Sequence, residues 1–242
     1  MRIIPYLSCK GTNVVKGIGM EGLRVVGNPV IMAASYYEQG ADEILYTDVV
    51  ASLYGRPPME SVIRPLAGSI FVPLTVCGGI KYMADVRAMF QYGAERVCIN
   101  TAAIARPEFI TEIAQAFGSQ AVMVGIEYLD GKCFTDAGRE PTGLDAWDWA
   151  RRVVDLGAGE ILATSIARDG TRRGFDLDFL TKLATLPIPV VAHGGAGSIE
   201  HIIEVAETGV SGIALGSVLH YKELNIPSIK VALKRAGEAV RL

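Results

Sequence analysis

The chain has 242 residues, half of them apolar, and a formal net charge of −3 at pH 7. This length and apolar content suit one large domain or two small ones with a substantial core, and the small charge gives no electrostatic reason to expect nucleic acid or an anionic membrane as a partner. No apolar stretch reaches the roughly 18 residues that a membrane span needs, and the first residues lack the apolar core of a secretory signal.

The elements expected in the first half are short apolar strands that alternate with helices. Asn28 is a helix cap, and Pro29 suits the first turn of the helix that follows it. The strands are expected at 2–7, 43–48, 73–76 and 96–100, and the helices at 28–40, 59–67, 83–93 and 107–118.

The second half repeats this alternation. Its strands are expected at 121–127, 160–165, 189–194 and 212–217, and its helices at 144–157, 176–186, 199–209 and 226–237. A small hairpin turn is expected at 130–132, just after the fifth strand. Eight strand–helix units in a chain of this length predict a closed (β/α)8 TIM barrel. An open, doubly wound parallel sheet is the alternative.

Three segments of the first half recur in the second at an offset of 116 or 117 residues. They are GADEIL at 40–45 and GAGEIL at 157–162, CGG at 77–79 and HGG at 193–195, and INTA at 99–102 and LGSV at 215–218. So constant a spacing predicts a single barrel domain over 1–242, built from two repeated half-barrels of about 1–119 and 120–242.

The repeated glycine pairs stand where strands of the barrel end. Gly79 and Asn100 lie 21 residues apart, as do Gly195 and Gly216, so each pair would join neighbouring strands at the face where barrel enzymes bind substrates. Glycine lets backbone N–H groups approach an anion closely. Two phosphate cradles are therefore predicted on opposite sides of one mouth: Gly78, Gly79, Asn100 and Thr101 form the first, and Gly194, Gly195, Gly216 and Ser217 form the second, with Gly170 beside it.

The cysteines and histidines follow no metal-ligand spacing. They are Cys9, Cys77, Cys98, Cys133, His193, His201 and His220. We expect reduced thiols in a cytoplasmic protein, no metal site and no cofactor.

Several longer motifs make the sequence recognisable. They are VVKG at 14–17, ADEILYTDVVAS at 41–52, INTAAI at 99–104, FGSQAV at 117–122, GAGEILATSIARDGT at 157–171 and HGGAG at 193–197. Together they resemble the HisF family, the cyclase subunit of imidazole glycerol phosphate synthase, nearly from end to end.

The resemblance implies an ammonia-using enzyme. In the family, a HisH-like glutaminase at the N-terminal face of the barrel releases ammonia, which passes through the interior. At the opposite face it attacks a ribulosyl aminoimidazole carboxamide that carries two phosphates, and imidazole glycerol phosphate is formed. The resemblance places an ammonia gate of charged residues at the entrance: Arg2, Glu43, Arg96 and Glu160. Arg96 stands where the family more often has lysine.

The resemblance also exposes two departures at the catalytic positions. The family uses an aspartate at the end of the first strand and another at the end of the fifth, where this chain has Ser8 and Glu127. Serine cannot do the acid–base work of a carboxylate near neutral pH, and the longer glutamate displaces its carboxyl group. Further family positions are kept at Lys16 and Asp169, which complete the catalytic set, and at Asp48 and Thr75, which are expected on the substrate face.

Three functions are compatible with this sequence. The first is a HisF-type synthase subunit in which Glu127 and Asp169 carry the proton transfers. The second is a divergent paralogue whose barrel conducts ammonia to another acceptor, for example in the amidation of surface sugars. The third is a non-catalytic binding partner of a glutaminase.

Overall fold

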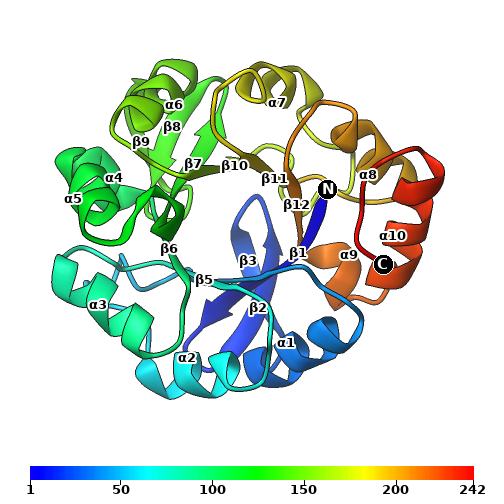
Figure 1. Ribbon diagram of the computed structural model, residues 1–242, viewed down its shortest axis with the longest axis horizontal. Coiled ribbons are helices and arrows are strands. Elements are labelled where there is room, and N and C mark those ends of the chain that lie inside the picture. Colours follow the sequence, from blue (N-terminus) through cyan, green and yellow to red (C-terminus); the bar gives the residue numbers. More distant parts are fainter.

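The computed structural model describes residues 1–242 as a ring of parallel strands with helices around it (Figure 1). Strand β12 pairs with β1, and β10 pairs with β7, so the ring closes without an edge. The predicted closed barrel is thereby confirmed, and the open sheet is wrong. The barrel strands are β1 (Arg2–Lys10), β4 (Ile44–Asp48), β5 (Leu74–Cys77), β6 (Arg96–Ile99), β7 (Val122–Leu129), β10 (Glu160–Ser165), β11 (Val190–His193) and β12 (Gly212–Leu215).

The helices lie outside the ring, where each covers the outer face of its neighbouring strands (Figure 1). The longer ones are α1 (Pro29–Glu38), α2 (Glu60–Ala67), α3 (Met83–Gln91), α5 (Glu108–Phe117), α6 (Ala146–Asp155), α7 (Leu177–Leu183), α8 (Ile199–Ala206) and α10 (Ile226–Arg235). The Asn28 side chain accepts hydrogen bonds from the N–H groups of Val30 and Ile31, as a cap followed by Pro29 should. No helix combines the length and hydropathy that a membrane span needs.

Short helices follow two strands directly. These are α4 (Thr101–Ala105) after β6 and α9 (Ser217–His220) after β12, and a single 3₁₀ turn, η1 (Ser119–Ala121), precedes β7. Both short helices begin at positions that the sequence assigns to the phosphate cradles. Their first N–H groups have no partner within the helix, so they are free to meet a ligand.

Two antiparallel excursions decorate the ring. Strands β2 (Asn13–Ile18) and β3 (Glu21–Gly27) form a hairpin that continues β1, and it crosses the middle of the ring in Figure 1. Strands β8 (Lys132–Thr135) and β9 (Glu140–Asp145) continue β7 through a turn at Asp130 and Gly131. The second turn was predicted from the sequence, whereas no strand was predicted over 13–27.

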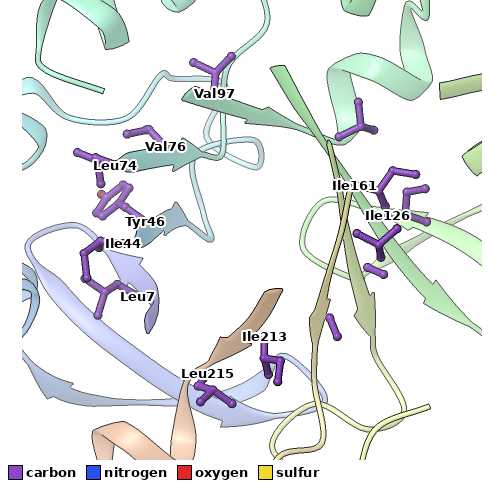
Figure 2. Close-up of a cluster of buried hydrophobic side chains, with 14 of the residues drawn as sticks. Leu7, Ile44, Tyr46, Leu74, Val76, Val97, Ile126, Ile161, Ile213 and Leu215 are labelled. Carbon is purple, nitrogen blue, oxygen red and sulfur yellow. The ribbon is translucent and has the colours of Figure 1, made fainter. Parts of the chain in front are cut away.

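The apolar core has two parts. The larger one joins strand residues such as Tyr46 and Val76 to helix residues such as Ile63, so it lies between the ring and the helices, and Figure 2 shows part of it. The smaller one fills the inside of the ring with Ile4, Tyr6, Leu45, Cys77, Cys98, Met123, Leu162, Val191 and Ala214.

Side chains two positions before and after the inner cluster also face the barrel axis, because strands alternate their faces. Before it come charged residues such as Arg2 and Glu160, and after it come polar ones such as Ser8 and His193. The interior therefore changes from charged at the amino ends of the strands, through an apolar middle, to polar at the carboxyl ends. The descent from two half-barrels remains a prediction.

Candidate active site

The two repeated glycine turns lie at the carboxyl ends of β5 and β11. Gly79 has φ +67°, and a Cβ there would lie 2.1 Å from the carbonyl oxygen of Arg56. Gly195 has φ +113°, and a Cβ there would lie 2.1 Å from the carbonyl oxygen of Gly174. Both turns thus need glycine for conformation and for space. In the first, the Gly79 N–H also donates to the Ser52 hydroxyl at 3.3 Å.

Three hollows open side by side at this end of the barrel, and together we call them the mouth. The first is lined by all four residues of the first cradle, Gly78, Gly79, Asn100 and Thr101. The last is lined by Gly170 and by all four residues of the second cradle, Gly194, Gly195, Gly216 and Ser217.

A central hollow joins the two cradles. It shares Tyr6 and Glu127 with the first hollow, and it shares Lys16, Asp169 and His193 with the last. The glycine turns therefore face one common opening, which is the geometry that a ligand with an anionic group at each end requires.

Glu127 lies between the two cradles, on β7. Its Oε2 accepts a hydrogen bond of 2.8 Å from the N–H of Gly138. Burial raises the pKa of Glu127 to about 7, although hydrogen bonds from Gly138 and Asn100 favour the charged form. A carboxyl group that titrates near neutral pH can both donate and accept a proton there.

Ser8 faces the same central hollow from β1. It is only 8% exposed, and it lines the hollow together with Glu127 and Asp169. The catalytic position expected from the sequence is thus placed in the mouth, but it offers a hydroxyl where a carboxylate was expected.

Lys16 connects the β2–β3 hairpin to the loop after β10. Its ammonium lies 2.7 and 2.9 Å from the two carboxylate oxygens of Asp169. The N–H of Gly19 also donates to the carbonyl oxygen of Asp169 at 2.9 Å. Burial alone would raise the pKa of Asp169, but the charges of Lys16 and His193 hold it below its usual range. The hairpin is thereby held against the rim of the mouth.

His193 is a site residue that the sequence analysis did not single out as functional. It ends β11, and its ring stacks on Tyr6 with 4.1 Å between centroids. Its Nδ1 lies 3.4 Å from the Thr164 hydroxyl, and its Nε2 lies 3.9 Å from Asp169 Oδ1. The alternation of faces from Val191 to His193 would have predicted that it points inward.

The excursion after β7 was also missed as part of the site. Ala137 lines the first and central hollows, and it has φ +58°, which is unusual for a residue with a side chain. The N–H of Asp136 donates to the Thr101 hydroxyl at 3.1 Å, and the Asn100 amide donates to the Phe134 carbonyl at 3.0 Å. The excursion therefore supports both the first cradle and Glu127.

The two remaining substrate-face expectations have different outcomes. Asp48 lines the first hollow, where Arg56 lies 2.7 Å from its carboxylate. The expectation for Thr75 needs correction, because its hydroxyl donates to Glu43 at 2.6 Å, at the opposite end of the barrel. Thr75 is only the second residue of the four-residue strand β5, so it cannot reach the carboxyl end.

Arg2, Glu43, Arg96 and Glu160 meet at the amino ends of the strands and form what we call the charged ring. Arg2 Nη1 lies 3.0 Å from Glu43 Oε2, and Arg96 Nη1 lies 3.1 Å from Glu43 Oε1 and 2.5 Å from Glu160 Oε2. Arg2 also pairs with Glu160. Each arginine thus bridges both carboxylates, and the ring crosses the barrel axis. A surface hollow lined by Arg2, Arg96 and Glu160 opens outside it.

Comparison with known proteins agrees with this architecture. The profile of the family described as "Histidine biosynthesis protein" matches residues 2–225. The chain is also 44% identical, over 247 aligned positions that cover all of it and 96% of the relative, to "Imidazole glycerol phosphate synthase subunit HisF" of Gluconacetobacter diazotrophicus. The chain therefore belongs to the histidine biosynthesis protein family and, within it, to the HisF family.

Proposed function

We propose that this protein is the synthase subunit of a glutamine amidotransferase complex. It would add ammonia to a bis-phosphorylated ribulosyl aminoimidazole carboxamide and so form imidazole glycerol phosphate. The observation that carries this proposal is the shared mouth, in which two glycine cradles flank a carboxyl group that titrates near neutral pH. The 44% identity with a HisF subunit supports the choice of substrate.

The phosphates would bind at the two cradles. The backbone N–H groups around Gly79 and at the start of α4 would hold one phosphate, and those around Gly195 and at the start of α9 would hold the other. Because these glycines carry no side chain of their own, anions can approach the backbone of the turns closely. Binding at both ends would fix the reacting carbon above the central hollow.

Glu127 would transfer protons to and from the acceptor. When ammonia adds to a carbonyl carbon, the nitrogen must lose a proton and the oxygen must gain one. With a pKa of about 7, Glu127 can supply or remove such a proton without a large energetic mismatch. Asp169 is less suited to this task in the observed arrangement, because Lys16 neutralises it.

Ammonia would enter at the charged ring. A glutaminase docked on the amino face would release it beside Arg2 and Glu160, and the apolar interior would exclude water and ammonium ions on the way. The ring is closed by ion pairs on both sides. One arginine must therefore move for a molecule to pass, and a partner that competes for its charge would favour that movement.

The decisive experiment is turnover of the ribulosyl substrate with ammonium salts in the absence of any glutaminase. We expect imidazole glycerol phosphate to appear, and we expect Ser8→Asp to raise the rate because it adds a carboxylate to the central hollow. Val15→Ile, a conservative change on the wall of the same hollow, serves as the control. Absence of product with the parent chain and with Ser8→Asp would reject this function.

A second candidate is a paralogue with another ammonia acceptor, and one observation favours it. The side chain facing the central hollow from β1 is a hydroxyl, and the carboxyl group facing it from β7 is bound to Gly138. Both differ from the family's paired aspartates, so the reacting group of the acceptor can differ as well. This candidate predicts no turnover of the ribulosyl substrate, together with stimulation of the partner glutaminase by the intact barrel.

A further inference from the structure

The carboxyl end of the barrel contains a buried imidazole with no role in the chemistry described above. His193 is 4% exposed, yet it lines both the central hollow and the hollow of the second cradle. It stands two residues beyond Val191, which belongs to the inner apolar cluster. A small molecule that leaves the apolar interior therefore meets the His193 ring as it enters the mouth.

The proton transfers of the proposed reaction need two groups, and the central hollow offers few. Lys16 and Asp169 are engaged with each other at 2.7 Å. Ser8 supplies a hydroxyl, and burial raises the pKa of the Tyr6 hydroxyl well above its usual range. Glu127 and His193 remain, and between about pH 4 and pH 7 the first is protonated and the second is neutral.

We propose that His193 is a second catalytic acid–base residue, which works opposite Glu127 and takes over the task that Ser8 cannot perform. This inference rests on the proposed function, since it assigns a residue to that reaction. It requires the imidazole to contact the reacting atoms, and His193, Ser8 and Glu127 line the same central hollow in which those atoms would lie.

The proton balance assigns complementary roles to the two residues. As the ammonia nitrogen bonds to the carbonyl carbon, neutral His193 accepts a proton from nitrogen, and protonated Glu127 gives one to oxygen. When the resulting carbinolamine loses water, His193 returns its proton to the departing hydroxyl, and Glu127 removes a proton from nitrogen. Both residues end in their initial states, and no other reactant is consumed.

The surroundings of His193 favour this neutral starting form. Burial lowers the pKa of His193 to about 4, Asp169 opposes the shift, and Lys16 adds to it. The other titratable groups around it are Tyr6, on which it stacks, Glu127 across the hollow, and His220, which lies behind Tyr6 and has a pKa lowered in the same way. An anion in the second cradle would raise the pKa of His193, because like Asp169 it stabilises the protonated ring.

A structural role must be separated from a chemical one, because His193 also packs. His193→Phe keeps an aromatic ring against Tyr6 but cannot carry a proton. His220→Gln is the matched control: His220 is half-buried, its nitrogens bind the Tyr36 hydroxyl at 2.8 Å and the Tyr6 carbonyl at 3.1 Å, and it lines none of the three hollows of the mouth. Thermal unfolding of each variant will show that the barrel is retained.

The kinetic test measures kcat and KM with ammonium and the ribulosyl substrate across pH. We expect His193→Phe to lower kcat by roughly 10²–10⁴-fold, as loss of an acid–base group does, with little change in KM. The acidic limb of the parent's pH profile should be absent from the variant, so the variant-to-parent ratio should rise as the pH falls through about 4; ionisations of substrate and ammonia cancel in that ratio. A His193→Phe variant that keeps its kcat within about threefold and retains both limbs would overturn the proposal.

A second test does not depend on turnover. The ring nitrogens of His193 are followed by NMR in the full chain as inorganic phosphate is added, with His220 as the internal reference. We expect phosphate to increase the protonated fraction of His193 more than that of His220. The two failures are distinguishable: a parent chain that does not convert the ribulosyl substrate rejects the proposed function, whereas a parent chain that turns over with a His193 unresponsive to phosphate overturns this inference alone.

Discussion

Glu127 links the chemistry of the mouth to the stability of the fold. Its carboxyl group lies between the two cradles, and burial raises its pKa to about 7, well above the ordinary value of 4.5. Such a group is protonated in the folded state at pH values where it is ionised in the unfolded state. The site therefore contributes stability below pH 4.5 that is progressively lost as the pH rises through 7.

Replacing this carboxyl group tests that argument. Glu127→Gln can keep an acceptor for the Gly138 N–H and removes the buried charge. We expect the variant to gain stability relative to the parent chain between pH 5 and 8, by no more than about 3 kcal/mol, while its acid–base activity falls roughly 10²–10⁴-fold. Urea unfolding at several pH values measures the gain, and Glu204→Gln, an exchange of a glutamate outside the mouth, is the control. A stability difference that does not change with pH would contradict the raised pKa.

At the scale of single elements, the β2–β3 hairpin is held at the mouth by few contacts outside β1. The pair of Lys16 with Asp169 is buried, and the Gly19 N–H adds one backbone hydrogen bond. Removing one partner of a buried pair leaves the other charge unpaired, which is strongly destabilising. Because the hairpin is a peripheral element, we expect it to detach locally while the barrel stays folded.

Lys16→Met tests this view of the hairpin. Amide hydrogen exchange within 13–27 should become faster while exchange in the barrel strands stays unchanged, and adding Asp169→Asn should restore part of the protection. The pKa of Asp169 in the folded protein is held below its usual range, so its ionised form stabilises the docked hairpin at pH values above that pKa. In the parent chain the same loosening should therefore occur as the pH falls through the folded-state pKa of Asp169. The control is Arg24→Met, which removes an exposed cation from the same hairpin. If amide exchange within 13–27 is as slow in Lys16→Met as in the parent chain, the pair of Lys16 with Asp169 does not hold the hairpin.

The glycine turns are elements whose shape the sequence predicted well. Gly195→Ala must accommodate a Cβ 2.1 Å from a carbonyl oxygen at φ +113°, so we expect the turn to shift and the second cradle to lose at least tenfold in phosphate affinity. Gly237→Ala is the matched control: φ there is also positive, at +96°, but no atom lies within 4 Å of the added Cβ. Calorimetric titration with inorganic phosphate measures both. Equal phosphate affinities in Gly195→Ala and Gly237→Ala would show that Gly195 is not part of the anion site.

The features that the sequence did not predict lack the apolar runs and bounding glycines that mark the barrel strands. Strands of the barrel are buried on both faces, so their apolar runs and bounding glycines could be recognised, and β10 was predicted with its observed bounds of Glu160–Ser165. Strand β3 of the hairpin is largely exposed, and the hairpin carries a glycine-rich, mixed sequence without the apolar run of a barrel strand. His193 follows no metal-ligand spacing, so only the alternation of faces along β11 could mark it, and Thr75 lies too early in β5 to reach the substrate face.

At the scale of the whole molecule, one barrel axis joins two charged ends through an apolar middle. The charged ring closes the amino end, the inner cluster fills the centre, and Glu127 and His193 face the opposite opening. Every second side chain of each strand faces the barrel axis, so residues at the same height on neighbouring strands form one layer. Gly212 contributes by having no side chain, since a Cβ there would lie only 3.1 Å from Ile4 Cδ1 in the inner cluster.

The charged ring makes a prediction about the stability of the whole barrel. Burial raises the pKa of Glu43, and Arg96, Thr75 and Arg2 oppose that shift. Arg96→Met removes the strongest of these opposing charges and leaves both carboxylates under-compensated, which should cost about 3–5 kcal/mol. Because the pKa of Glu43 then rises further, the loss should be larger at pH 8 than at pH 5, and Glu43→Gln in the same chain should recover part of it. Arg64→Met, which breaks an exposed pair with Glu60, should cost no more than about 1 kcal/mol. Urea unfolding of Arg96→Met, Glu43→Gln and the double variant gives a double-mutant cycle, and Arg64→Met is its control. If the free-energy changes of Arg96→Met and Glu43→Gln simply add in the double variant, the ring does not act as one unit.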